Sequence, residues 1–218
     1  MNYLINEIMT LLNNRDFEFA VCGGYSIELF LDKEIRPHGD IDISAYWVDR
    51  DKIILYMKSL GWDIYEMCGD GIAHKIRDVS QQLRIKRNIF CIKGNCELVK
   101  LYPRNEADMF YLEFDGKGQT EPNFIEFLFN NRTETNFLYA RNTNITRVLS
   151  KAILKRNDIP FLAPEIVLLY KSTDIGRIGY QLDYEEAIRA MDIEQKAWLA
   201  SALNVMYPAG HQWANTGI

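Results

Sequence analysis

Residues 21–44 read VCGGYSIELFLDKEIRPHGDIDIS. This stretch begins with apolar residues, passes through a pair of glycines, and ends in an alternation of acidic and apolar residues. An apolar run that stops at glycine predicts a buried strand followed by a turn. We therefore expect a strand that ends at Cys22, a short helix over Tyr25–Asp32, and a second strand that begins with Asp40–Ser44.

Asp40 and Asp42 are two positions apart in the second predicted strand. Alternate residues of a strand share a face and lie about 6–7 Å apart, so both carboxylates point the same way while Ile41 and Ile43 enter the core. Two carboxylates this close repel each other unless a cation lies between them. A pair of magnesium ions about 3.5–4 Å apart would offset both charges and suits in-line phosphoryl transfer. The same alternation also fits an edge strand with one solvated face, so the pattern alone leaves both interpretations open.

Gly23 and Gly24 stand between the first predicted strand and the helix. A glycine pair at this place lets backbone N–H groups approach an anion, and the positive end of the helix favours one. The pair therefore predicts a site for a triphosphate, although Gly-Gly alone also fits an ordinary turn. Arg36 and His38 precede the acidic strand and could add positive charge near the same phosphates, although each alone fits a solvated loop.

The rest of the chain divides into a strand-rich part and a helical part. Short apolar or alternating segments predict strands at residues 63–67, 88–92, 98–102, 109–114, 124–129 and 137–140. After Thr146 the pattern becomes helical: Pro164 suits the first turn of a helix, and Asp192 with Gln195 forms a capping-box pattern. We expect an α/β (α+β) fold, with a mixed β-sheet and flanking helices over residues 1–146 and a small helical domain over residues 147–218.

Composition narrows the class of protein. A hydrophobic content of 48% and a charged content of 25% are those of a globular chain with a core. The net charge of −5 argues against the dense basic face that non-specific nucleic-acid or membrane-surface binding requires. No apolar run approaches the roughly 20 residues of a membrane helix, and the four cysteines lack zinc-type spacing. We expect a soluble, reduced, cytoplasmic protein.

The order and spacing of these residues resemble the signature of polymerase-β-type nucleotidyltransferases. That signature has an apolar residue, two small residues, a spacer helix, and Asp-x-Asp between apolar residues. The aminoglycoside and lincosamide nucleotidyltransferase subgroup typically reads Gly-Gly-Trp, a short helix, and Arg-x-His-x-Asp-Ile-Asp. The residues that match here are Gly23, Gly24, Arg36, His38, Asp40 and Asp42, with Tyr25 where Trp is usual. Weaker similarity covers nearly the whole chain, at Tyr139–Asn142, Ile159–Glu165, Leu168–Lys171, Trp198, His211 and Trp213.

The resemblance implies a catalytic nucleotidyltransferase domain over residues 1–146 that uses magnesium, with two ions expected. It implies transfer of a nucleoside monophosphate from an NTP, expected to be ATP, to a hydroxyl of a small molecule, with release of pyrophosphate. The acceptor could be an aminoglycoside or lincosamide antibiotic. In this interpretation Asp40 and Asp42 bind the metal, while the Gly23-Gly24 pair, Arg36 and His38 contact the nucleotide.

Members of this family use a third acidic residue on a neighbouring strand, which completes the metal site or acts as general base on the acceptor hydroxyl. Glu126 is our choice, because a carboxylate in the apolar segment Phe124–Phe129 needs a partner. Glu113, which would share a strand face with Asp115, and Glu97 are the alternatives.

One departure from the family pattern bears on function. Relatives often carry Lys-Asp where this chain has Gly179-Tyr180, shortly before Asp183-Tyr184. If that lysine contacts phosphate or acceptor in relatives, the contact is lost here or taken over by Lys171. Two alternatives therefore stay open beside small-molecule transfer. One is a toxin-like nucleotidyltransferase that modifies a protein or an RNA, of which the acidic pI disfavours RNA. The other is a relative that binds nucleotide without turnover.

Overall fold

The protein is described from a computed structural model that covers residues 3–85, 88–94, 96–116, 118–119 and 121–214. Contacts between residues divide the chain into two units, each made of two separate segments. Unit 1 comprises Met1–Phe19 and His38–Asn130, and unit 2 comprises Ala20–Pro37 and Asn131–Ile218. The predicted division between residues 146 and 147 rests on sequence character alone and stays a prediction.

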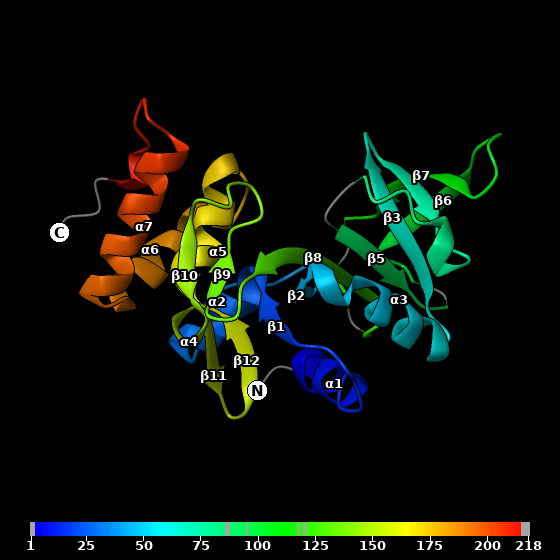
Figure 1. Cartoon of the computed structure of the whole chain (residues 1–218), viewed down its shortest axis with the longest axis horizontal. Coiled ribbons are helices and arrows are strands. Elements are labelled where there is room, and N and C mark those ends of the chain that lie inside the picture. The colour runs from blue at the N-terminus through cyan, green and yellow to red at the C-terminus, as the bar shows by residue number, and fades with distance from the viewer. Residues whose placement is uncertain (1–2, 86–87, 95, 117, 120, 215–218) are drawn as a thin grey trace. The chain divides into compact units, whose positions relative to one another are not determined.

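Unit 1 is built on a mixed sheet with the strand order β2-β8-β5-β3-β4-β7-β6 (Figure 1). Its strands are β2 (Asp42–Tyr46), β3 (Asp63–Gly69), β4 (Ile72–Lys75), β5 (Asn88–Ile92), β6 (Val99–Pro103), β7 (Met109–Phe114) and β8 (Phe124–Arg132). The β2–β8 pair is parallel, and the remaining neighbours in this order are antiparallel. The parallel pair is the part of the sheet that carries the predicted acidic residues.

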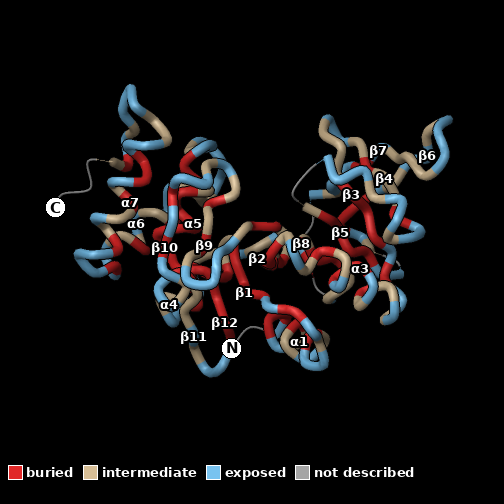
Figure 2. Tube along the Cα trace, in the orientation of Figure 1, coloured by how far each residue is buried: buried red, intermediate tan, exposed pale blue. Residues whose placement is uncertain are grey.

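Two helices bury apolar faces in unit 1. Helix α1 (Tyr3–Leu11) buries Leu4, Ile5 and Ile8, whose spacing places them on one face of the helix. Helix α3 (Arg50–Ser59) follows the short helix η1 (Trp47–Asp49) and contacts β3. Figure 2 shows buried residues along the central strands and on one side of these helices.

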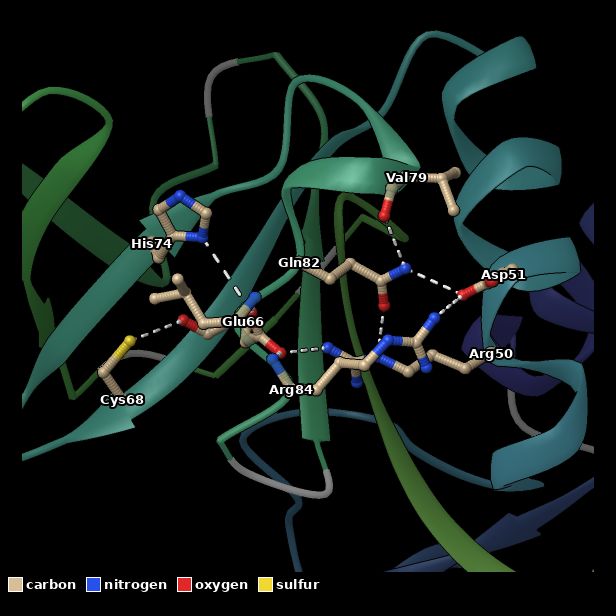
Figure 3. Close-up of polar contacts among 9 residues, drawn as sticks. Arg50, Asp51, Glu66, Cys68, His74, Val79, Gln82 and Arg84 are labelled. Carbon is tan, nitrogen blue, oxygen red and sulfur yellow. Dashed lines mark hydrogen bonds and ion pairs between the residues drawn. The ribbon is translucent and has the colours of Figure 1, made fainter.

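A buried ion pair joins α3 to β3 (Figure 3). Arg50 and Glu66 are both 0% exposed, and Arg50 Nη2 donates to Glu66 Oε1 at 2.6 Å. The backbone N–H groups of Leu83 and Arg84, which follow the short helix η2 (Val79–Gln81), donate to the same carboxylate at 2.6 and 2.5 Å. Burial lowers the pKa of Arg50, and the charge of Glu66 opposes that change. Glu66 therefore links α3, β3 and residues 83–84.

The sheet of unit 2 is small. Strand β12 (Ile159–Leu162) pairs in parallel with β1 (Phe19–Cys22) and antiparallel with β11 (Ile153–Arg156). Strand β9 (Asn136–Leu138) pairs with β10 (Thr146–Val148) and with the end of β8, and the short helix α4 (Leu149–Ala152) leads from β10 to β11. Asn157 and Asp158 connect β11 to β12 with φ values of 48° and 63°, which is the geometry of a two-residue hairpin turn.

The helices of unit 2 pack around α5 (Pro164–Lys171), which contacts α2 (Gly23–Leu31), α6 (Tyr180–Ala190) and α7 (Ile193–Met206). The short helix η3 (Ser172–Asp174) follows α5, and η4 (Gln212–Ala214) contacts α7. Pro164 begins α5, and Asp192 and Gln195 form the predicted capping box at the start of α7. Across the described ranges, no helix combines the length and apolar character needed to cross a bilayer.

The predicted mixed α/β architecture is confirmed, with differences in detail. Helix α2 begins at Gly23 and not at Tyr25, and β2 begins at Asp42 and not at Asp40. The chain after Thr146 is not helical from the start, because the β11–β12 hairpin precedes α5. Pro160 counts against a strand in the sequence, since proline cannot donate a hydrogen bond to a ladder.

Candidate active site

Three carboxylates of unit 1 converge at the start of β2 and on β8. Asp42 is the first residue of β2, and Glu126 is its direct partner on the parallel strand β8. Asp40 lies two residues before Asp42. Each of the three offers one carboxylate oxygen, these oxygens all lie within 4.8 Å of one another, and all three residues are half-buried. The structure thus brings together the three residues predicted to hold metal, and we call them the acidic triad.

The strands orient these side chains because the residues beside them belong to the core. Residues in direct register on neighbouring strands point to the same face of a sheet. The residues on either side of Asp42 and Glu126 are 0% exposed, and they are Ile41, Ile43, Ile125 and Phe127. Their burial fixes the register, so Asp42 and Glu126 both point away from that apolar layer.

Asn88 contacts the acidic triad and was missed by the sequence analysis. It is the first residue of β5, the antiparallel neighbour of β8, and its Nδ2 donates to Glu126 Oε1 at 2.8 Å. The register places Phe90 opposite Glu126 and Asn88 opposite Leu128. Asn88 is therefore a diagonal neighbour of Glu126 across the ladder, a pairing that no local sequence motif indicates.

The segment that carries Asp40 packs against the segment that leads into β8. The carbonyl oxygen of Gly39 accepts a hydrogen bond from the backbone of Gln119 at 2.8 Å, and the side chain of Gln119 donates to the carbonyl of Phe124 at 2.9 Å. A Cβ atom on Gly118 would lie 3.4 Å from the carbonyl oxygen of His38. These contacts hold the residues before β2 in unit 1, including the half-buried His38, whose predicted contact with nucleotide stays a prediction.

The donor set of the acidic triad fits a hard divalent cation. Magnesium prefers oxygen ligands, and carboxylates are the usual ones that proteins supply. Three carboxylates whose oxygens lie within 4.8 Å repel one another, and a divalent cation would offset that repulsion. Asp40, Asp42 and Glu126 could therefore hold a metal ion.

The other acidic candidates lie outside this group. Glu113 on β7 and Glu97, which precedes β6, are both exposed. The carboxylate of Asp115 pairs with Lys100 at 2.8 Å. Among the carboxylates proposed for the third position, Glu126 is the one that lies with Asp40 and Asp42, while its chemical role stays a prediction.

Gly23 and Gly24 are the first two residues of α2 in unit 2. Gly23 has a φ of 66°, a conformation that strongly favours glycine. The residue before it, Cys22, makes no side-chain capping hydrogen bond with the helix. The first N–H groups of a helix attract anions, so the predicted contact with phosphate is compatible with this local structure and stays a prediction.

Arg36 lies in unit 2 with a buried partner that the sequence analysis did not foresee. Its Nε and Nη2 donate to the two carboxylate oxygens of Asp183 at 2.8 and 2.7 Å, and Lys171 Nζ lies 2.9 Å from Asp183 Oδ2. Asp183 is 0% exposed. Burial raises its pKa, but the hydrogen bonds and charges of Arg36 and Lys171 outweigh burial and lower the pKa overall. Arg36 therefore has a structural role here, and its contact with nucleotide stays a prediction.

The Gly179-Tyr180 departure packs around the same buried carboxylate. A Cβ atom on Gly179 would lie 2.7 Å from Arg36 Nε, and the φ of Gly179 is 86°. The ammonium group of Lys171 lies 4.0 Å from the centre of the Tyr180 ring, which is cation–π geometry. Arg36, Lys171, Gly179, Tyr180 and Asp183 thus form one unit-2 cluster, which we call the Asp183 cluster.

Comparisons with known proteins agree with the resemblance seen in the sequence. The sequence profile of the family described as aminoglycoside-2''-adenylyltransferase matches residues 4–83, which include Asp40 and Asp42 but not Glu126. No match was found among curated protein sequences.

Solved structures share the fold. The solution structure of the antibiotic-resistance factor ANT(2'')-Ia is 12% identical with a TM-score of 0.50, covering 94% of this chain and 92% of that one. A crystal structure of ANT(2'')-Ia in complex with adenylyl-2''-tobramycin is 10% identical with a TM-score of 0.51, covering 93% and 97%. Lincomycin-bound lincosamide antibiotic adenylyltransferase LnuA is 15% identical with a TM-score of 0.51, covering 88% and 98%. At these identities the likeness is one of fold.

Proposed function

We propose that this chain is a metal-dependent nucleotidyltransferase that transfers a nucleoside monophosphate from an NTP to a hydroxyl of a small molecule. The observation that carries the proposal is the acidic triad, in which Asp40, Asp42 and Glu126 converge from β8 and the start of β2. The family profile over residues 4–83 and the shared fold support it. A cytoplasmic location is part of the proposal.

Each member of the acidic triad has a role in this proposal. Asp40 and Asp42 would hold magnesium, with two ions expected, and Glu126 would complete the site or act as general base. When bound, magnesium would lower the pKa of the acceptor hydroxyl and offset the charge of the phosphates. As the acceptor oxygen bonds to the α-phosphorus and the bond to pyrophosphate breaks, a carboxylate oxygen of Glu126 would take the hydroxyl proton.

The comparisons support a proposal for the acceptor and the nucleotide. The similar structures are of adenylyltransferases described with a lincosamide or with an adenylylated aminoglycoside. We therefore propose ATP as the nucleotide and an aminoglycoside or lincosamide antibiotic as the acceptor. In the same proposal, Gly23 and Gly24 contact phosphate through the N-terminus of α2.

The test is pyrophosphate release with each NTP across a panel of aminoglycosides, lincosamides and small alcohols, with magnesium and with chelator. We expect Asp42→Asn and Asp40→Asn to lower turnover at least about 100-fold, the scale on which removing one preorganised electrostatic group acts. Asp115→Asn is the matched control, because it neutralises a carboxylate of unit 1 that pairs with Lys100. It should keep the parent's turnover.

The outcomes distinguish an enzyme, a protein that only binds nucleotide, and failure of the proposal. Magnesium-dependent thermal stabilisation by an NTP together with pyrophosphate release supports the enzyme. Stabilisation without release across the panel supports a relative that binds nucleotide without turnover. If no NTP stabilises the parent and none is consumed, the proposal is wrong.

A further inference from the structure

We infer that Asn88 is a positioning residue that orients the Glu126 carboxylate within the acidic triad. The inference rests on the proposed function, because it assigns a role toward the metal ion that the triad would hold. It adds to that function a residue outside the three carboxylates and beyond the matched residues 4–83.

The contact is specific in chemistry as well as in geometry. Asn88 Nδ2 lies 2.8 Å from Glu126 Oε1, and an ionised carboxylate can only accept a hydrogen bond. The side-chain NH₂ group of Asn88 must therefore face Glu126. An ionised carboxylate has about four lone-pair sites, so a hydrogen bond from Asn88 is compatible with a role of Glu126 in binding a cation or accepting a proton.

A neutral donor suits this place better than a charged one. Lysine or arginine at position 88 would neutralise the Glu126 carboxylate and compete with a cation for it. The amide of Asn88 fixes the carboxylate and adds no charge. Carboxylates that bind metal are commonly held by such a hydrogen-bonding partner outside the coordination sphere, and losing the partner typically weakens metal affinity or activity about 10–100-fold.

The backbone around Asn88 is itself well held. Ile89, the next residue, pairs with Glu66 in the β3–β5 ladder and is 0% exposed. Glu66 in turn accepts the backbone N–H groups of Leu83 and Arg84. Asn88 therefore begins a strand, β5, that is held by β3 on the edge opposite β8. This pairing fixes the position of the Asn88 backbone.

The test uses Mn²⁺ as the probe and the full chain as the protein. Mn²⁺ affinity is measured by calorimetry without nucleotide, and kcat and KM are measured separately for the acceptor that the parent uses. We expect Asn88→Leu to weaken Mn²⁺ binding about 10-fold or more and to lower kcat more than it raises the KM for the acceptor. Asn88→Gln keeps an amide donor and should recover part of the affinity.

Asn130→Leu is the matched control, because Asn130 is a buried amide on β8 that donates to Ser44 Oγ at 3.0 Å. It should lower the melting temperature and leave Mn²⁺ affinity close to that of the parent. Equal losses of affinity in Asn88→Leu and Asn130→Leu would overturn the inference, since they would show a general disturbance of the sheet. Affinity and kcat of Asn88→Leu within twofold of the parent would overturn it as well.

Asp42→Asn distinguishes failure of the inference from failure of the proposed function. If the parent binds Mn²⁺ and Asp42→Asn does not, the metal site stands, and the Asn88 variants decide the inference alone. If the parent does not bind Mn²⁺, or if Asp42→Asn binds it as tightly, the proposed function fails and the inference fails with it.

Discussion

At Gly179, a methyl group in place of an α-hydrogen would lie 2.7 Å from Nε, 2.9 Å from Cδ and 3.0 Å from Cζ of Arg36. The guanidinium cannot simply move away, because both carboxylate oxygens of the buried Asp183 hold it. The φ of 86° adds strain for any residue that has a Cβ atom. These contacts and the positive φ favour glycine at position 179, where relatives often carry lysine.

We therefore predict that Gly179→Ala lowers the free energy of unfolding by about 1–3 kcal/mol. Gly176→Ala is the control, because it lies in the same connection and its Cβ would meet no atom within 4 Å. Urea unfolding of both variants measures the difference. Equal stability of the two variants would show that the contact with Arg36 is not restrictive.

The carboxylate of Glu66 connects α3, β3 and residues 83–84 through an ion pair with Arg50 and hydrogen bonds from the backbone. Glu66→Gln keeps only one oxygen, so it can accept just one of the two backbone hydrogen bonds, which end on different oxygens of the carboxylate. It also leaves the Arg50 guanidinium buried without a compensating charge. Removing one partner of a buried ion pair typically costs about 3–5 kcal/mol. We expect Glu66→Gln to lower the free energy of unfolding on that scale, measured by urea denaturation.

The double variant with Arg50→Met tests the cause. It removes the uncompensated charge, so it should be more stable than Glu66→Gln alone. Asp115→Asn breaks the more exposed pair with Lys100 in the same unit and should lower the free energy of unfolding much less than Glu66→Gln does. A double variant that is less stable than Glu66→Gln would mean that packing of Arg50, and not its charge, supplies the stability.

Across the chain, periodic patterns predicted several elements of each unit and missed others, among them β4 and α6. Strands β5 and β7 have their predicted bounds, because their apolar and aromatic segments are bounded by polar or turn residues. The β11–β12 hairpin was missed because Pro160 argues against a strand. Its connecting residues, Asn157 and Asp158, are the signal that could have indicated it, since both residue types tolerate positive φ.

The candidate site was predictable where a residue carries a signal in its own local sequence. Asp40 and Asp42 form a local motif, and Glu126 could be chosen because an acidic residue in an apolar strand is unusual. Asn88 and the partnership of Arg36 with Asp183 depend on which strands and helices become neighbours. Arg36 and Asp183 are 147 positions apart, and no sequence periodicity specifies such a pairing.

Two buried carboxylates of unit 2 give the stability of the chain a distinctive dependence on pH. The pKa of Asp183 is lowered overall, so the native state binds fewer protons there than the unfolded state. The stability from Asp183 is complete above its unfolded pKa of about 3.9 and is lost as pH falls through the folded pKa. The pKa of Glu165 is raised, because burial outweighs its hydrogen bonds from Arg147 and Gln195. Above about pH 4.3, the contribution of Glu165 to the free energy of unfolding therefore falls as pH rises.

Asp183→Asn should therefore cost several kcal/mol at pH 7, since Arg36 and Lys171 would lose their shared carboxylate; removing one partner of a buried pair costs about 3–5 kcal/mol. The difference from the parent should shrink as pH falls below about 4, because Asp183 of the unfolded parent then takes up a proton, whereas the folded carboxyl stays ionised until pH falls through its lowered pKa. Glu165→Gln should show the opposite trend. Its free energy of unfolding relative to the parent should increase as pH rises from about 4.3 through the raised pKa of Glu165. Free energies of unfolding in urea between about pH 3 and pH 7 measure both trends, a range chosen to span the ordinary carboxyl pKa values. A difference for Asp183→Asn that is constant across this range would show that its carboxyl pKa is not lowered by folding.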